Sequence, residues 1–175
     1  MKTKFLTGLM LLAGASSIWA AGTAPSVPTV EDNVRKALVT MPYFSVFDDL
    51  SYKVDNGVVT LSGAVTQPYL KDYAEKAVKG VAGVTAVNDQ IEVLPLSPFD
   101  DQIRLRTLRS LERTSSLYRY FMGTNPSIRI VVKNGHVTLD GIVGNAMDRQ
   151  LAFMSANGVS GVFSVTNDLR IAPKL

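Results

Sequence analysis

The residues best placed to do chemistry are three arginines near the middle of the chain. Arg106, Arg109 and Arg113 follow one another at intervals of three and four residues, so on a helix they lie within about 60° of each other. Guanidinium groups gathered on one helix face suit the recognition of anions such as phosphates and carboxylates. The alternative interpretation is an ordinary solvated helix face that binds nothing.

The apolar residues of this predicted helix occupy most of its opposite side: Ile103, Leu105, Leu108 and Leu111. Arg104 falls inside this apolar sector, which departs from a simple amphipathic pattern.

A segment that is both aromatic and basic follows the helix. It contributes the remaining candidate site residues, which are Tyr118, Arg119, Tyr120, Phe121 and Met122. Aromatic rings beside basic side chains suit a membrane interface, where each basic residue contributes roughly 1 kcal/mol against anionic lipid. Together with the three arginines they form the predicted lipid- or anion-binding site. The alternative is that the aromatic rings close the core or a contact between domains.

Other kinds of chemistry find no support in the sequence. The chain has no cysteine and a single histidine, His136, which excludes a thiolate nucleophile, a disulfide and a paired-histidine metal site. No G-x-S-x-G elbow and no phosphate-binding loop occurs. The acidic pairs Asp48-Asp49 and Asp100-Asp101 fit a loop before a strand and a helix start. We therefore expect no enzymatic activity, no cofactor and no metal.

The elements that position these residues follow from a stretch that the chain uses twice. Residues 56–65 return as 134–143, with seven of ten positions identical. Each stretch begins with Asn-Gly, the strongest short signal for a two-residue hairpin turn. A second similarity relates residues 80–87 to 158–165 at the same offset of 78 residues. One long period of this kind predicts two copies of one small domain rather than a solenoid.

Each copy is predicted to run helix, strand, strand, helix, strand. The fold class is thus α+β, with two tandem small αββαβ domains, each a three-stranded mixed sheet with two helices on one face. The connection from the second strand through the helix to the last strand should be a right-handed crossover, which leaves the last strand parallel to the second. We expect strands at about 50–54, 58–65 and 84–93 in the first copy and at about 127–133, 136–143 and 162–171 in the second.

The helices are predicted from caps, prolines and apolar spacing. The first starts at Thr29, stops at Pro42 and buries Val30, Val34, Ala37, Leu38 and Met41. The second covers about 68–80, with Tyr69, Tyr73, Ala77 and Leu70 facing inward. In the second copy, Ser97 caps a helix that begins at Pro98, and another helix covers 146–157. The second copy is nine residues longer between helix start and hairpin.

The first residues resemble a secretory signal peptide. Lys2 and Lys4 precede an apolar run, and Ala20 is a small residue suited to cleavage. We predict a signal peptide at 1–20, a linker at 21–28, the first domain at 29–94, a linker at 95–97 and the second domain at 98–173. The mature chain would then be periplasmic, with no transmembrane segment and no lipid anchor.

The two halves differ in charge. Residues 21–97 carry six basic and nine acidic side chains, whereas residues 98–175 carry ten and six. Eight of the nine arginines lie in the second half. Such an asymmetry indicates that the second half faces an anionic partner.

The repeated motifs resemble those of the BON domain family. They are a helix before a hairpin, the V-x-L-x-G strand at 59–63 and 137–141, and the G-V-x-x-V run at 83–87 and 161–165. The resemblance covers nearly all of the predicted mature chain. It implies non-catalytic, periplasmic domains of the cell envelope, whose members bind anionic phospholipid, support outer-membrane integrity, respond to osmotic stress or assist secreted proteins.

We therefore expect a periplasmic protein that binds anionic phospholipid or a membrane surface peripherally. Related envelope lipoproteins have a lipidated cysteine, which this chain lacks, so attachment would be reversible. The alternative is a chaperone or adaptor for secreted or outer-membrane proteins, bound through sheet edges or the aromatic segment. Export removes the chain from nucleic acid, so we do not expect a nucleic-acid partner.

Overall fold

The computed structural model describes residues 29–173. The predicted signal peptide, its cleavage site and the linker at 21–28 lie outside the described residues. The first copy contains α1 (Val30–Val39), β1 (Asp49–Asp55), β2 (Val58–Val65), α2 (Pro68–Lys79), β3 (Ala86–Asp89) and β4 (Glu92–Val93). The second contains α3 (Pro98–Arg113), the 3-10 helix η1 (Tyr118–Tyr120), β5 (Ile128–Lys133), β6 (His136–Val143), α4 (Ala146–Asn157) and β7 (Ser164–Ile171).

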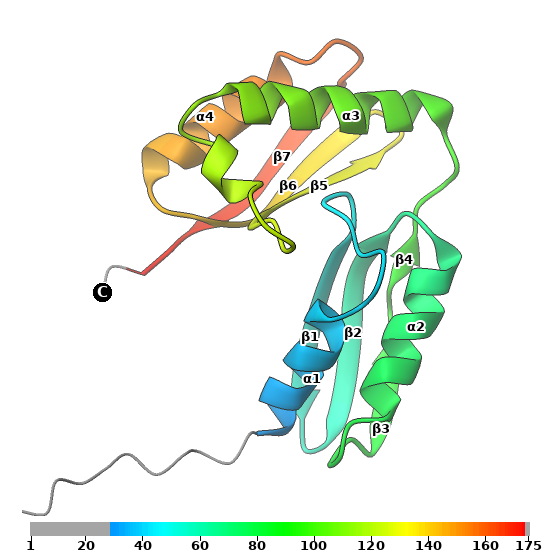
Figure 1. Ribbon diagram of the computed structural model, residues 1–175. Coiled ribbons are helices and arrows are strands. Elements are labelled where there is room, and N and C mark those ends of the chain that lie inside the picture. Colours follow the sequence, from blue (N-terminus) through cyan, green and yellow to red (C-terminus); the bar gives the residue numbers. More distant parts are fainter. Residues whose placement is uncertain (1–28, 174–175) are drawn as a thin grey trace, which may run out of the picture.

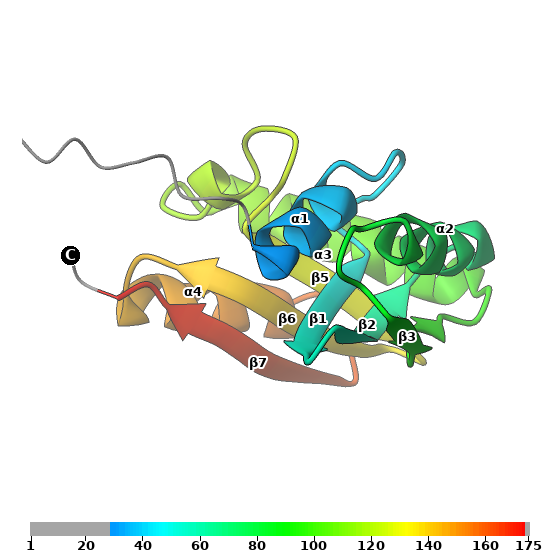
Figure 2. The same ribbon diagram turned by 90° about the horizontal axis from the view of Figure 1, so that it is seen from below.

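Each copy folds into its own mixed sheet, as predicted. β1 pairs antiparallel with β2, and β5 pairs antiparallel with β6. The strand that follows the crossover helix is parallel to the middle strand in both copies. In each copy the two helices lie on one face of the sheet (Figure 1), and the view from below shows the strands beneath them (Figure 2).

The last strand of the first copy is split into β3 and β4, where the sequence predicts one continuous strand. The break falls at Gln90 and Ile91, between the two short strands. The amide of Ile91 donates to the Asp89 carboxylate at 2.9 Å, and its carbonyl accepts from Lys71 Nζ at 2.7 Å. The backbone amide and carbonyl of Ile91 therefore form hydrogen bonds with side chains instead of with a neighbouring strand.

The two hairpin turns have the left-handed backbone that Asn-Gly predicts. Asn56 and Gly57 have φ of 49° and 82°, and Asn134 and Gly135 have 52° and 78°. These positive angles match the type I′ turn expected of two-residue hairpins.

The V-x-L-x-G motif ends on a glycine that the sheet requires. Gly63 and Gly141 have φ of 112° and 129°. A Cβ at Gly63 would lie 2.3 Å from the Asp49 carbonyl oxygen, and one at Gly141 would lie 1.9 Å from the Ser127 carbonyl oxygen. Only glycine leaves room for the neighbouring strand at these positions.

Each copy has its own apolar core between sheet and helices. The predicted inner face of the first helix is confirmed for Val34, Leu38 and Met41, which are buried. For the second helix the prediction is confirmed for Leu70 and wrong for the two tyrosines. Tyr69 and Tyr73 are 49% and 45% exposed, and the buried residues are Leu70, Ala74 and Val78. The smaller side chains allow α2 to approach the sheet and α1 closely.

The helix of the second copy is rotated relative to the apolar pattern. Leu105 is 45% exposed, although it was assigned to the apolar side, and Leu108 is only half-buried. Arg104, in contrast, is only 4% exposed, and Thr107 is fully buried. Arg104 takes an inner position because its Nη2 donates to the Val132 carbonyl of β5 at 2.7 Å.

The two copies are joined through a segment that precedes β1. The carbonyl of Val46 accepts a hydrogen bond from the amide of Ile130 at 2.9 Å, which extends the second sheet beyond β5. Val46 and Phe47 also pack against the core of the second copy. Lys133 forms an ion pair with Glu92 across the same junction. We call residues 44–48 the clasp, because this part of the first copy completes the second.

Candidate anion-binding site

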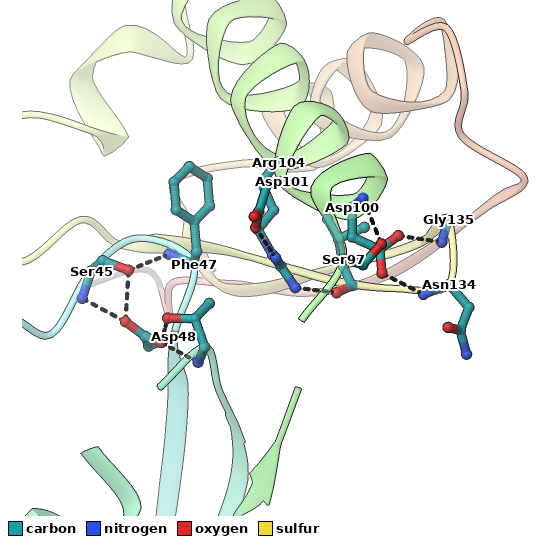
Figure 3. Close-up of polar contacts among 11 residues, drawn as sticks. Ser45, Phe47, Asp48, Ser97, Asp100, Asp101, Arg104, Asn134 and Gly135 are labelled. Atoms are coloured by element: carbon teal, nitrogen blue, oxygen red, sulfur yellow. Dashed lines mark hydrogen bonds and ion pairs between the residues drawn. The ribbon is translucent and has the colours of Figure 1, made fainter. Parts of the chain in front are cut away.

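The helix α3 that carries the three arginines is fastened at its first turn. Ser97 Oγ accepts from the Asp100 amide at 3.2 Å and so caps the helix. The Asp100 carboxylate, which is 1% exposed, accepts from the amides of Asn134 and Gly135 at 2.9 Å and 2.8 Å (Figure 3). Asp100 is thus a structural link between helix and hairpin turn as well as a favourable first-turn acid.

The buried Arg104 fixes the rotation of the helix about its axis. Besides its bond to β5, its Nη1 forms an ion pair with Asp101 on the same helix (Figure 3). With Arg104, Thr107 and Leu111 facing inward, Arg106 and Arg109 must face outward, because they lie about 100° or more away around the helix.

Arg106, Arg109 and Arg113 are exposed and line one hollow of about 370 Å³. The hollow is closed on the other side by Val159 and Ser160, in the turn between α4 and β7. Arg106 Nη1 donates to the Ser160 carbonyl at 3.3 Å, and its Nη2 donates to Gln102 Oε1 at 3.1 Å.

The charge of this hollow is not neutralised by neighbouring acids. Within residues 29–173, the ion pairs involve Lys71, Lys79, Arg104, Arg119 and Lys133, and none includes the three arginines of the hollow. Positive groups without carboxylate partners, held on a helix of fixed orientation, can attract an anion from solution.

The aromatic segment is divided between core and surface. Tyr118 and Met122 are 52% and 61% exposed, whereas Tyr120 is 8% exposed and Phe121 packs against the core. None of the residues from Tyr118 to Met122 lines the arginine hollow. Tyr120 and Phe121 thus occupy the core, as the alternative interpretation of this segment has it.

Tyr120 and Arg119 serve a polar network beneath the end of β6. The Tyr120 hydroxyl donates to Asp148 Oδ2 at 2.6 Å and accepts from the Gly144 amide at 2.8 Å, while Arg119 forms an ion pair with the same carboxylate. Burial alone raises the pKa of Asp148, but the hydrogen bonds that it accepts from Tyr120 and Arg119, together with the guanidinium charge, lower the pKa on balance. Arg119 is therefore paired with Asp148, although much of its side chain remains exposed.

The other polar candidates have structural surroundings. His136 is exposed, and its Nδ1 lies 2.7 Å from Ser164 Oγ. Asp48 is fully buried and accepts hydrogen bonds from Ser45 and Thr66. In the described part of the chain, no group of three or more His, Cys, Asp or Glu side chains is arranged to hold a metal ion. Across the same residues no helix has both the length and the apolarity to cross a bilayer.

Two surface features were missed by the sequence analysis. One is an apolar hollow of about 550 Å³ lined by Pro42, Tyr43, Tyr69 and Tyr73. The spacing of Tyr69 and Tyr73 predicts a core position, but the same spacing is equally compatible with an exposed face. The other is a hollow at the junction of the two copies, which depends on long-range contacts that have no local signal in the sequence.

Both copies match the model of one known domain family. A family model for the BON domain matches residues 26–95 and again 100–173. The chain is 32% identical over 123 residues to the "Osmotically-inducible protein Y" of Escherichia coli (strain K12), covering 70% of this chain and 61% of that protein. The chain thus spans less than two thirds of this relative's length.

Two solved structures were also found. They are structures of CdsD, a structural protein of the type III secretion system of Chlamydia trachomatis, one of them its C-terminal domain. The two matches are 13% and 12% identical and cover 81% and 83% of this chain and 96% and 93% of those chains. Their TM-scores are both 0.34, a likeness too low to inform fold or function. The family match, in contrast, covers both copies, and the chain belongs to the BON domain family as a tandem pair.

Proposed function

We propose that the protein is a non-catalytic periplasmic envelope protein that binds anionic phospholipid reversibly through the arginine hollow of its second copy. The observation that carries this proposal is that three exposed arginines line one hollow and none pairs with a described carboxylate. Phosphate headgroups are the anions that a membrane presents, and guanidinium groups bind them in a forked geometry.

Further features support a membrane partner. The excess of basic side chains lies in the second half of the chain. Tyr118 and Met122 expose apolar surface elsewhere on that copy, suited to the headgroup region. The predicted signal peptide favours the periplasm. The relative's name refers to induction by osmotic change, which favours a role in outer-membrane integrity under osmotic stress.

A protein-binding role, as chaperone or adaptor for secreted or outer-membrane proteins, is the second candidate. The hollow of Pro42, Tyr43, Tyr69 and Tyr73 favours it, because exposed apolar patches commonly mark interaction sites. Capture of a client strand at the β5 edge of the second sheet is less favoured. The Ile130 amide already donates to Val46, and the Val132 carbonyl already accepts from Arg104.

Liposome co-sedimentation tests the lipid proposal. Replacing Arg106, Arg109 and Arg113 with Ser should weaken binding to anionic liposomes by ~3 kcal/mol, about 150-fold, because each surface arginine contributes roughly 1 kcal/mol. The matched control replaces three exposed lysines of the first copy with Ser: Lys36, Lys53 and Lys76. This control loses the same net charge but should retain most of the binding.

The wild-type interaction should also weaken as salt is added and should be absent from neutral liposomes. Equal loss in both triple variants would mean that only net charge matters and would reject the site. Undiminished binding by the arginine variant would do the same. The second candidate would be favoured if the arginine variant captured unfolded outer-membrane proteins while both triple variants kept their liposome binding.

A further inference from the structure

A second hollow, separate from the arginine hollow, lies where the two copies meet. It has a volume of about 220 Å³. Its walls come from α1 and β1 of the first copy and from β5 and the loop before β5 in the second. We propose that this junction hollow binds a small amphipathic carboxylate, of the fatty-acid type, with its charged end held between Arg35 and Arg129.

Arg129 is the residue that marks the hollow as a binding site. Its guanidinium lies 4.7 Å from the centre of the Phe44 ring, and its Nη1 donates to the Ser45 carbonyl at 3.0 Å. Burial lowers the pKa of Arg129, with the charges of Asp49 and Asp48 acting in the opposite sense. Among the described residues it forms no ion pair. A half-buried cation that no carboxylate contacts directly is stabilised when an anion binds beside it.

The rest of the lining offers contacts for both the charged end and the apolar end of an amphipathic ligand. Arg35 on α1 provides a second positive charge and also forms no ion pair in the described part of the chain. Tyr52 and Asn125 provide polar groups that can donate to a carboxylate oxygen. The apolar lining is Leu38, Val39, Phe44 and Leu50. The volume lies below the about 300–1,000 Å³ of pockets for drug-sized ligands, which restricts the occupant to a short chain.

One acid, Asp49, also lines the hollow. Burial raises the pKa of Asp49, and repulsion from Asp140 acts in the same sense, against the attraction of Arg129 and Arg170. Among the residues that line the hollow, two arginines face this one carboxylate, so the lining keeps an excess of positive charge with Asp49 ionised. Asp48 also acts on Arg129 but does not line the hollow. A monocarboxylate therefore matches its charge, whereas a cation does not.

Octanoate is the probe, titrated into the full chain below its micelle concentration and followed by calorimetry. The wild type should bind it saturably. Arg35→Gln and Arg129→Met should each weaken binding by about tenfold or more, since each removes a charge-assisted contact. The contacts of the clasp with the second copy come from Val46, Phe47 and Arg129, and no ion pair in residues 29–173 includes Arg35. Arg35→Gln therefore tests the site without removing one of these contacts. Lys36→Gln, a neighbouring exposed lysine outside the hollow, should change binding by less than about twofold.

Neutral octanol separates charge from apolar binding and should bind about tenfold more weakly than octanoate. The proposal is overturned if octanoate does not saturate, if octanol binds equally well, or if Lys36→Gln is as damaging as Arg35→Gln. It is also overturned if replacing Arg106, Arg109 and Arg113 abolishes octanoate binding while Arg35→Gln retains it. That last result would assign the ligand to the arginine hollow instead.

Discussion

Gly141→Ala should destabilise the second copy strongly. A Cβ at this position would lie 1.9 Å from the Ser127 carbonyl oxygen, an atom that no side-chain rotation can move. That carbonyl also accepts the Ile142 amide at 3.0 Å, so relieving the clash would weaken this hydrogen bond. Overpacking of this kind costs about 1–3 kcal/mol, and a left-handed backbone costs an alanine about 1–2 kcal/mol more.

The expected loss is therefore about 2–5 kcal/mol, a large part of the about 5–15 kcal/mol that stabilises a typical domain. Urea unfolding followed by circular dichroism measures it. Gly158→Ala is the matched control, since Gly158 follows α4 with φ of −80° and a Cβ there would lie 3.5 Å from the Met154 carbonyl oxygen. The control should be neutral or slightly stabilising, because alanine lowers the entropy of the unfolded chain.

The duplication provides an internal repeat of the experiment. Gly63→Ala in the first copy meets the Asp49 carbonyl oxygen at 2.3 Å, whereas Gly80→Ala meets only ordinary contacts at 3.5 Å or more. If Gly141→Ala and Gly158→Ala had equal stabilities, or Gly63→Ala and Gly80→Ala did, the steric explanation of the motif glycine would be refuted.

Two further predictions concern acid stability and the clasp. Asp148→Asn should flatten the loss of stability on acidification. Hydrogen bonds from Tyr120 and Arg119 hold the folded pKa below the unfolded value of about 3.9, so the carboxylate contributes stability above about pH 4 that disappears as pH falls through the folded value. Urea unfolding at neutral and acid pH measures how the free energy of unfolding changes with pH. If this dependence were the same in wild type and Asp148→Asn, the prediction would be contradicted. Phe47→Ala should destabilise the second copy by about 1–3 kcal/mol although Phe47 belongs to the first, because its ring packs on the second core. Hydrogen exchange of the β5–β7 amides measures this, with the exposed Tyr43→Ala as control, and protection unchanged by Phe47→Ala would reject the coupling.

Features that depend on interactions between residues close in the sequence could be predicted from the sequence. The Asn-Gly turns, the Ser97 cap and the order of elements follow from residues that act on their immediate neighbours. The parallel third strand followed from the crossover connection through a helix. The exposure of Arg106, Arg109 and Arg113 followed from helical spacing alone.

What could not be predicted depends on contacts between distant residues. Tyr69 and Leu70 are both apolar and adjacent, so the pattern left open which of them faces inward, and packing against α1 and the sheet decided it. Leu105 is displaced outward because Arg104 turns inward to satisfy the Val132 carbonyl, which lies on another element. The clasp pairs Val46 with Ile130, and no local pattern marks either residue as a partner.

The clasp has a consequence for separating or reordering the two copies. The first copy contributes backbone and side chains of the clasp to the second, and Arg129 of the second copy in turn packs on Phe44 and donates to the Ser45 carbonyl of the first. Reversing the order of the copies, or expressing the second without the first, would uncover the outer side of β5 and invite strands of other molecules to pair there. We therefore expect the second copy to be less stable alone than in the tandem pair.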